Sequence, residues 1–301
     1  MSEPSGLNFG IVTFPGSNCE QDVMAALTYL GYQGSYVWHD QVDLDGYDAL
    51  ILPGGFSYGD YLRCGAIARF SPVMRALQDY AAAGRPVLGI CNGFQILTEA
   101  GLLPGVLMRN RGLKFLCQSV WLRVEASVCQ WLDLQPGSVI ELPINHFDGN
   151  FYCDDLTLGR LEAKGQVVLR YTAADGLAAQ SGAAPNGSLS DIAGICNERG
   201  NVFGLMPHPE RATDGLNGSD GQHFFAAIVR RLAAQAAIQA GTVGTPDAAD
   251  AAGATDAADA AGTPDTPDTA DTPDAADTPD AATAATAPNA PGVVATEGVS
   301  G

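Results

Sequence analysis

The segment from Pro86 to Gln95 constrains the fold of this chain more than any other. An apolar run typical of a buried strand leads into Gly-Ile-Cys-Asn-Gly, and a helix-like segment follows up to residue 100. Glycines two residues before and two residues after Cys91 remove side chains that would collide with the strand and the helix. The pattern predicts a nucleophile elbow with cysteine in place of serine. At the N-terminus of the helix, free N–H groups and the helix dipole would favour a thiolate.

The same pattern has a simpler interpretation. A cysteine between two glycines is often only a small, inert residue in a tight turn. Because Gly-x-Cys-x-Gly is short, it does not decide between the two interpretations, and the rest of the chain has to.

Apolar runs and helix-like segments alternate along the first part of the chain. Strands are expected at residues 7–14, 36–38, 48–52 and 87–90, and helices at residues 17–30 and 70–83, the first of them capped by Ser17 or Asn18. This alternation predicts an α/β fold with a doubly wound, mostly parallel sheet. Ligands of such sheets collect at the carboxyl ends of the strands, where Cys91 lies.

A different pattern begins near residue 114. Short strands separated by turn residues are expected at residues 115–124, 138–144, 166–171 and 190–195, followed by a strand at 202–206 and a last amphipathic helix at 220–239. We interpret the short strands as an antiparallel edge of the same domain.

The segment Pro207-His208-Pro209-Glu210 follows the strand at 202–206. Two prolines favour an extended chain, in which residues two apart point the same way, so His208 and Glu210 would be presented together. A carboxylate beside an imidazole fixes its tautomer and stabilises the imidazolium, as in a Cys-His-acid triad. Alone, the segment fits a solvated surface loop as well; after a nucleophile elbow, the triad is favoured.

A third segment, Pro53-Gly54-Gly55, also follows an expected strand. Glycines at a strand end let backbone N–H groups approach a substrate closely. With the N–H of Asn92 they would form an oxyanion hole for a tetrahedral intermediate. A plain tight turn is the alternative.

The end of the chain differs from the rest in composition. From Thr242 onward the chain is mainly Ala, Thr, Pro, Asp and Gly, and Thr-Pro-Asp occurs five times. This tail holds ten Asp and one Glu, more than half of the formal net charge of −19. It has too little apolar area to offset the entropy of ordering. We therefore expect a globular domain at residues 1–241 and a disordered acidic tail at 242–301.

Charge and cysteine usage exclude several classes of protein. A mildly acidic body argues against nucleic-acid binding, and no stretch approaches the length of a membrane span. The seven cysteines form no Cys-x-x-Cys pair and no histidine pair has zinc spacing, so we expect no zinc site. The odd number of cysteines and the length of the chain argue against a disulfide framework. The N-terminus lacks a basic patch followed by an apolar run, and we expect a cytoplasmic protein.

The motifs at residues 89–95 and 207–211 resemble those of the triad (class I) glutamine amidotransferases. Three further motifs are similar to the glutaminase subunits of phosphoribosylformylglycinamidine (FGAM) synthase: they lie at residues 14–20, 53–65 and 143–146. The resemblance covers roughly residues 7–235. One departure is the sequence Phe147-Asp148-Gly149, where the family tends to have Gly-Glu-Gly.

The resemblance implies a flavodoxin-like fold and a role for each matching residue. Cys91 would attack glutamine, His208 would act as base and then acid, and Glu210 would orient His208. Gly55 and Asn92 would supply oxyanion N–H groups, and Gln95 would help to hold the substrate. No metal or cofactor is expected in this chain. ATP, Mg²⁺ and formylglycinamide ribonucleotide (FGAR) would bind a large synthetase subunit, with a small subunit bridging the two.

Two other classes of protein remain open at this point. A Cys-elbow peptidase or deglycase of the DJ-1 type is one, although those often have His directly after the nucleophile, where this chain has Asn92. A non-catalytic scaffold is the other. We interpret the remaining cysteines as packing residues, Cys117, Cys129 and Cys196 above all, and His39, His146 and His223 as structural. The segment 58–65 and the antiparallel edge are the expected docking surfaces.

Overall fold

A computed structural model of the chain describes residues 6–176 and 182–239. The expected tail at 242–301 and the boundary at 241 lie outside the described residues, so both stay predictions. Within the described ranges, no helix is both long enough and apolar enough to cross a bilayer.

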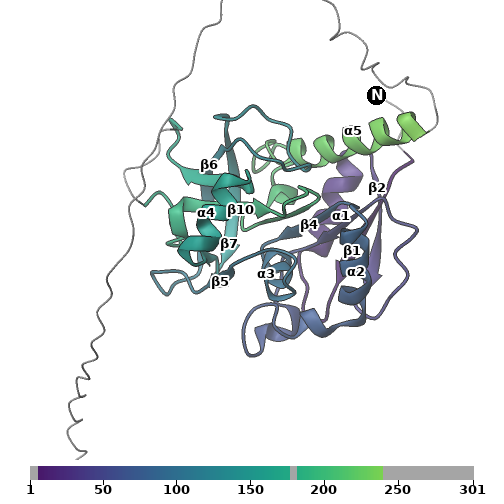
Figure 1. The fold of residues 1–301 in the computed structure, drawn as a ribbon, viewed down its shortest axis with the longest axis horizontal. Helices are drawn as coiled ribbons and strands as arrows, with labels where there is room; N and C mark the ends of the chain where they lie inside the picture. The colour runs from purple at the N-terminus through teal and green to yellow at the C-terminus, as the bar shows by residue number, and fades with distance from the viewer. Residues whose placement is uncertain (1–5, 177–181, 240–301) are drawn as a thin grey trace, which may run out of the picture. The chain divides into compact units, whose positions relative to one another are not determined.

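A nine-stranded sheet forms the centre of the described part, in the order β2-β1-β3-β4-β11-β10-β9-β6-β7 (Figure 1). Strands β2, β1, β3, β4 and β11 run parallel, and the strands from β10 to β7 extend the sheet in antiparallel pairs. The predicted α/β fold with an antiparallel edge is confirmed. The strands of this sheet are β1 (Asn8–Thr13), β2 (Gln33–Trp38), β3 (Ala49–Leu52), β4 (Val87–Ile90), β6 (Leu116–Val124), β7 (Val139–His146), β9 (Val167–Thr172), β10 (Ile192–Cys196) and β11 (Val202–Leu205).

Helices cover both faces of the parallel part of the sheet, with α1 and α5 on one face and α2 and α3 on the other (Figure 1). This is the arrangement that right-handed crossovers produce when the chain first winds outward to β2 and then back through β3 and β4. The helices are α1 (Glu20–Tyr29), α2 (Pro72–Ala82), α3 (Asn92–Glu99), α4 (Asp155–Ala163) and α5 (Gln222–Gln239), with short 3₁₀ turns η1 (Ser57–Asp60), η2 (Ala68–Phe70), η3 (Leu189–Asp191) and η4 (Pro209–Arg211).

The structure differs from the sequence prediction in one helix cap and in three elements that were not expected. Neither Ser17 nor Asn18 caps α1: Ser17 Oγ accepts a hydrogen bond from the N–H of Phe14, and Cys19 occupies the capping position but its side chain makes no capping hydrogen bond to the helix. Helix α4 and a two-stranded sheet of β5 (Val106–Met108) and β8 (Asn150–Tyr152) were not expected. Helix α4 buries only Leu161, so its sequence carries almost no amphipathic signal.

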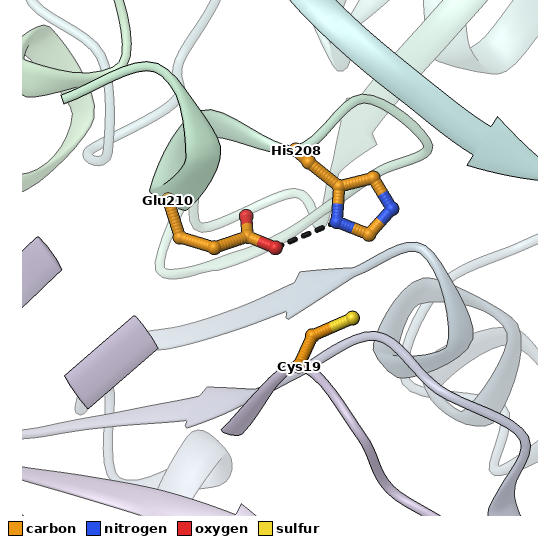
Figure 2. Close-up of side chains that lie close together, drawn as sticks. All are labelled: Cys19, His208 and Glu210. Atoms are coloured by element: carbon orange, nitrogen blue, oxygen red, sulfur yellow. Dashed lines mark hydrogen bonds and ion pairs between the residues drawn. The ribbon is translucent and has the colours of Figure 1, made fainter. Parts of the chain in front are cut away.

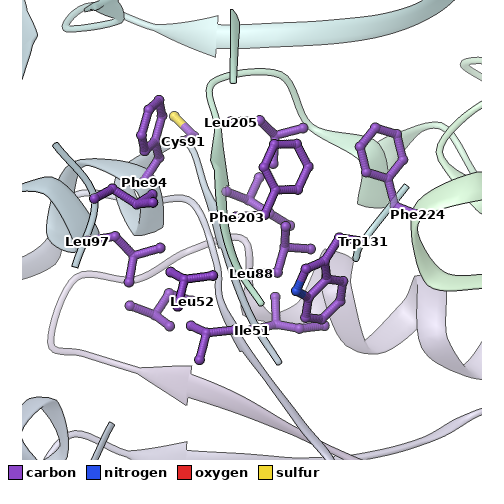
Figure 3. Close-up of a cluster of buried hydrophobic side chains, with 14 of the residues drawn as sticks. Ile51, Leu52, Leu88, Cys91, Phe94, Leu97, Trp131, Phe203, Leu205 and Phe224 are labelled. Atoms are coloured by element: carbon purple, nitrogen blue, oxygen red, sulfur yellow. The ribbon is translucent and has the colours of Figure 1, made fainter. Parts of the chain in front are cut away.

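Aromatic residues join the central strands to α5 (Figure 3). The rings of Phe203 on β11 and Phe224 on α5 are stacked with centroids 6.2 Å apart, and both side chains are fully buried. Trp131 packs in the same cluster, and its Nε1 donates to the carbonyl of Asn201 at 3.1 Å. This packing fixes β11, and therefore the segment that follows it, against the rest of the sheet.

Substituting Phe203→Ala should lower the free energy of unfolding by about 3–5 kcal/mol, because it leaves a cavity between β11 and α5. Urea denaturation followed by circular dichroism measures the loss. The matched control is Leu156→Ala on α4, whose side chain is 73% exposed and whose loss should change stability by less than about 0.5 kcal/mol. Equal effects of the two substitutions would contradict the packing described.

Candidate active site

Cys91 lies on a sharp turn between β4 and α3. Its backbone has φ 51° and ψ −102°, a region that costs a non-glycine residue about 1–3 kcal/mol and is found mostly at functional sites. The two flanking glycines are sterically required. A Cβ at Gly93 would lie 2.0 Å from the carbonyl oxygen of Leu52, and one at Gly89 would lie 2.5 Å from a methyl group of Leu97. The predicted elbow geometry is therefore present.

The neighbouring strand supplies the second part of the site. Strands β4 and β11 are parallel neighbours in which Ile90 pairs with Leu205, so both chains leave the sheet at the same level. The N–H of Cys91 donates to the carbonyl of Leu205 at 2.8 Å. Three residues after Leu205 comes His208, whose Nδ1 lies 2.6 Å from Oε1 of Glu210. Both side chains are buried.

The reason that His208 and Glu210 meet differs from the one expected. Residues 209–211 form the 3₁₀ turn η4 rather than an extended segment. Glu210 reaches the imidazole because the turn folds back on His208, and the N–H of Arg211 donates to the carbonyl of His208 at 3.3 Å. Pro209 fits the first position of such a turn as well as it fits an extended chain.

Cys91 and His208 line one small pocket, which we call the Cys91 pocket and which has a volume of about 60 Å³. Burial lowers the pKa of His208, but the negative charges of Glu210 and Cys91 raise it well above its ordinary value. The Cys91 sulfur and the imidazole thus interact electrostatically, and Nε2 of His208 has no hydrogen-bond partner within the described residues. An imidazolium held by a buried carboxylate is the partner that a reactive thiolate needs.

Backbone N–H groups of the two expected oxyanion residues face no secondary-structure partner. Asn92 is the first residue of α3, so its N–H precedes the hydrogen bonds of the helix. Gly55 lines the pocket at φ +145°, and a Cβ there would lie 2.7 Å from the backbone nitrogen of Asn18. The β-bridge between Ser17 and Gly55 is formed by hydrogen bonds of the Gly54 carbonyl and the Phe56 N–H. The N–H of Gly55 takes no part in these bonds.

The side chain of Gln95 lines the pocket, but its amide is engaged within the protein. Its Oε1 accepts from Nδ2 of Asn92 at 2.9 Å, and its Nε2 donates to the carbonyl of Asp148 at 2.5 Å. These bonds connect the first turn of α3 to the loop after β7. Gln95 therefore lines the pocket and also holds the loop after β7 against α3.

Sequence reasoning missed Cys19, which lies against the catalytic candidates (Figure 2). Donor atoms of Cys19, His208 and Glu210 all lie within 4.8 Å of one another, close enough to share a metal ion. A guanidinium nitrogen of Arg211 lies 3.3 Å from the Cys19 sulfur, which opposes a cation there. Burial raises the pKa of the Cys19 thiol, although His208 counteracts the effect. The motif at residues 14–20 was the available signal, since it follows β1 at the same edge of the sheet.

His146 was expected to be structural, yet it too lines the Cys91 pocket. It is buried, and neither ring nitrogen has a hydrogen-bond partner within the described residues. Burial, together with the charge of His208, lowers its pKa to about 3, so the ring is neutral. By contrast, Nδ1 of His39 lies 3.1 Å from the hydroxyl of Tyr58, away from this pocket.

Comparisons with known proteins identify the family to which the chain belongs. Residues 7–226 match the family model of the CobB/CobQ-like glutamine amidotransferase domain. The chain belongs to this family. It is 55% identical to the phosphoribosylformylglycinamidine synthase subunit PurQ of Gloeobacter violaceus over 74% of this chain and 97% of the relative. It is 53% identical to the subunit PurQ of Trichormus variabilis, over 76% of this chain and 100% of the relative.

A solved structure of PurLQS from Thermotoga maritima contains a similar chain. The two share 43% identity with a TM-score of 0.66, and the match covers 75% of this chain and 99% of that chain. The resemblance to glutaminase subunits of FGAM synthase is thereby confirmed, together with the fold. The comparisons give no support to the DJ-1 type of peptidase or deglycase.

One cysteine contradicts its expected role in packing. Cys117 on β6 is exposed, because residues 116–119 pair only with β7 and extend beyond the end of β9. Cys196 is fully buried as expected, and Cys129 is partly buried against the core. All seven cysteines, every one of them within the described ranges, are free.

Replacing Glu210 by Gln should lower the pKa of His208, because it removes a carboxylate charge that favours the imidazolium. The imidazolium of His208 should then lose its proton at a lower pH than in the unchanged protein. Titrating the histidine ring resonances by NMR measures it. The control is Glu198→Gln, at an exposed glutamate paired with Lys164. An unchanged His208 titration would contradict the ion pair described.

Proposed function

We propose that this protein is the glutaminase subunit of FGAM synthase, which hydrolyses glutamine to glutamate and passes ammonia to a synthetase that converts FGAR to FGAM with ATP. One observation carries the proposal: a cysteine in a strained elbow shares a pocket with His208, which is paired with the buried Glu210. The similarity to PurQ subunits over nearly their whole length supplies the particular synthase.

In the proposed mechanism, the thiolate of Cys91 attacks the side-chain amide carbon of glutamine. The N–H groups of Gly55 and Asn92 stabilise the negative oxygen of the tetrahedral intermediate. His208, oriented by Glu210, gives its proton to the departing nitrogen, so ammonia leaves and a thioester forms. His208 then takes a proton from water, which attacks the thioester and releases glutamate and the free thiolate. Gln95 holds the pocket wall beside the substrate.

The ammonia needs a receiving partner, since free ammonia is mostly protonated at neutral pH and then is not nucleophilic. The sequence contains no Gly-x-x-x-x-Gly-Lys-Ser/Thr loop for ATP. We therefore assign ATP and Mg²⁺ to a large synthetase subunit, with a small subunit bridging it to this chain; the similarity to a chain of the PurLQS structure supports a complex of this kind. A cytoplasmic location, where Cys91 stays reduced, fits this assignment.

An exposed apolar segment beside the pocket is the proposed docking surface for the synthetase. Tyr61 and Leu62 are 71% and 80% exposed, and they follow directly after the pocket residue Asp60. Exposed aromatic and aliphatic side chains gathered in this way mark protein interfaces more often than isolated ones do. The antiparallel edge is a second proposed contact, because Trp121 on its strand β6 is exposed.

Cys91→Ala should abolish glutamine-dependent FGAM synthesis, with a loss of at least about 1,000-fold. Synthesis from added ammonium in the assembled complex should remain, because the synthetase chemistry does not use the thiol. Cys117→Ala, at the exposed cysteine of β6, is the matched control and should leave both activities unchanged. Loss of both activities in the Cys91 variant would contradict the assignment.

Replacing Leu62 by Asp should weaken association with the synthetase by roughly tenfold or more, since it places a charge in an apolar contact. Analytical ultracentrifugation or calorimetric titration of the two purified components measures the affinity. Leu156→Asp on α4, at a site equally exposed but distant in the sequence, is the control. If the Leu62 variant binds the synthetase with unchanged affinity, the segment is not part of the interface.

A further inference from the structure

Two carboxylates, those of Asp60 and Asp148, line the Cys91 pocket in addition to the proposed triad. Asp60 ends the turn η1 after β3, and Asp148 lies in the loop after β7. The thiol of Cys64 lies between them: its sulfur donates to Oδ2 of Asp148 at 3.2 Å and also interacts with Asp60. A thiol is a weak donor with a single proton, so the two carboxylates keep most of their acceptor capacity.

The acidic pair has no counter-charge of its own. In residues 6–176 and 182–239, no ion pair includes Asp60 or Asp148. Burial and the charge of Asp148 raise the pKa of Asp60, as expected when like charges approach each other. A cation bound between the two carboxylates would relieve this repulsion.

His146 gives an independent indication that the pocket receives a polar ligand. The side chain is 3% exposed, and both of its ring nitrogens lack a partner in the described part of the chain. A Cβ at Gly149 would lie 2.2 Å from the ring, so the ring can occupy this position only because residue 149 is a glycine. Buried polar atoms without partners are costly and rare, and a ligand with polar groups would supply the missing bonds.

The acidic pair is attached to the same helix turn as the nucleophile. Nδ2 of Asn92 donates to Oδ1 of Asp60 at 3.4 Å, and Nε2 of Gln95 donates to the carbonyl of Asp148 at 2.5 Å. Tyr58, Asp60 and Leu62 all have positive φ, which holds this loop in an unusual conformation. These bonds hold the Asp60 side chain and the backbone of Asp148 against the first turn of α3.

We propose that Asp60 and Asp148 bind the α-ammonium group of the substrate and so select L-glutamine over amides that lack this group. The inference rests on the proposed glutaminase function and adds the residues that recognise the amino-acid end. The α-ammonium is the one cationic group of glutamine, and the pair of unneutralised carboxylates is complementary to it. With that end held, the side-chain amide extends toward Cys91.

The test compares L-glutamine with glutaramate, which is the same molecule without the α-amino group. Ammonia release is measured with the full chain in its synthetase complex. Asp148→Asn and Asp60→Asn should each lower kcat/KM for glutamine by about 10- to 100-fold, the size expected for a charged hydrogen bond. For glutaramate the same substitutions should change kcat/KM by less than about threefold. The control is Asp155→Asn at the exposed start of α4.

An equal loss for both substrates would overturn the proposal, because it would show that the carboxylates only support the fold of the pocket. Unchanged kcat/KM for glutamine would overturn it as well. If the parent complex hydrolyses neither substrate, the proposed function fails instead. Calorimetric binding of glutamine and glutaramate to the Cys91→Ala chain then tests the acidic pair separately: preference for glutamine that disappears in the Asp148→Asn double variant supports it, and no preference overturns it.

Discussion

The unfavourable backbone conformation of Cys91 is the constraint on which the rest of the site depends. A residue at φ 51° holds that conformation only if its surroundings over-determine it. The structure does so from three sides: the N–H of Cys91 is bonded to Leu205, its carbonyl accepts from the N–H of Gln95, and Gly93 packs directly on the backbone of Leu52. Strand, neighbouring strand and helix therefore act together to present the sulfur to the pocket.

The order of the strands explains why distant segments meet at this sulfur. Because β11 is the parallel neighbour of β4, the residues after Leu205 emerge beside Cys91. The antiparallel edge completes the pocket: the N–H of His208 donates to the carbonyl of Pro143 on β7 at 2.8 Å, which brings His146 and Asp148 to the same place. The antiparallel strands thus form part of the site as well as extending the sheet.

Local pattern alone predicted the strands of the central sheet, most helices and the segments that carry Cys91, His208 and Glu210, because each of these has a signature in the residues next to it. Cys19, Asp60 and His146 lie within the motifs at residues 14–20, 53–65 and 143–146, but the sequence alone did not show which residue of each motif faces the site. Each lines the pocket only because β1, β3 and β7 end at the same edge of the sheet, and strand order is not readable from periodicity. Helix α4 was missed for a different reason: it is held by the Asp154 cap and buries a single leucine, so no apolar stripe marks it.

The charges of the pocket are separated in a way that suits a two-step acyl transfer. Glu210 and the sulfur raise the pKa of His208, whereas burial, together with the charge of His208, lowers the pKa of the nearby His146 and keeps it neutral. One imidazole is therefore available to give up a proton, while the other offers hydrogen bonds without competing for that proton. Asp60 and Asp148 approach from other loops: Asn92 bonds to the carboxylate of Asp60, and Gln95 bonds to the backbone carbonyl of Asp148. A substrate that reaches from the carboxylates to the sulfur would thus be positioned by residues that are all anchored to one helix turn.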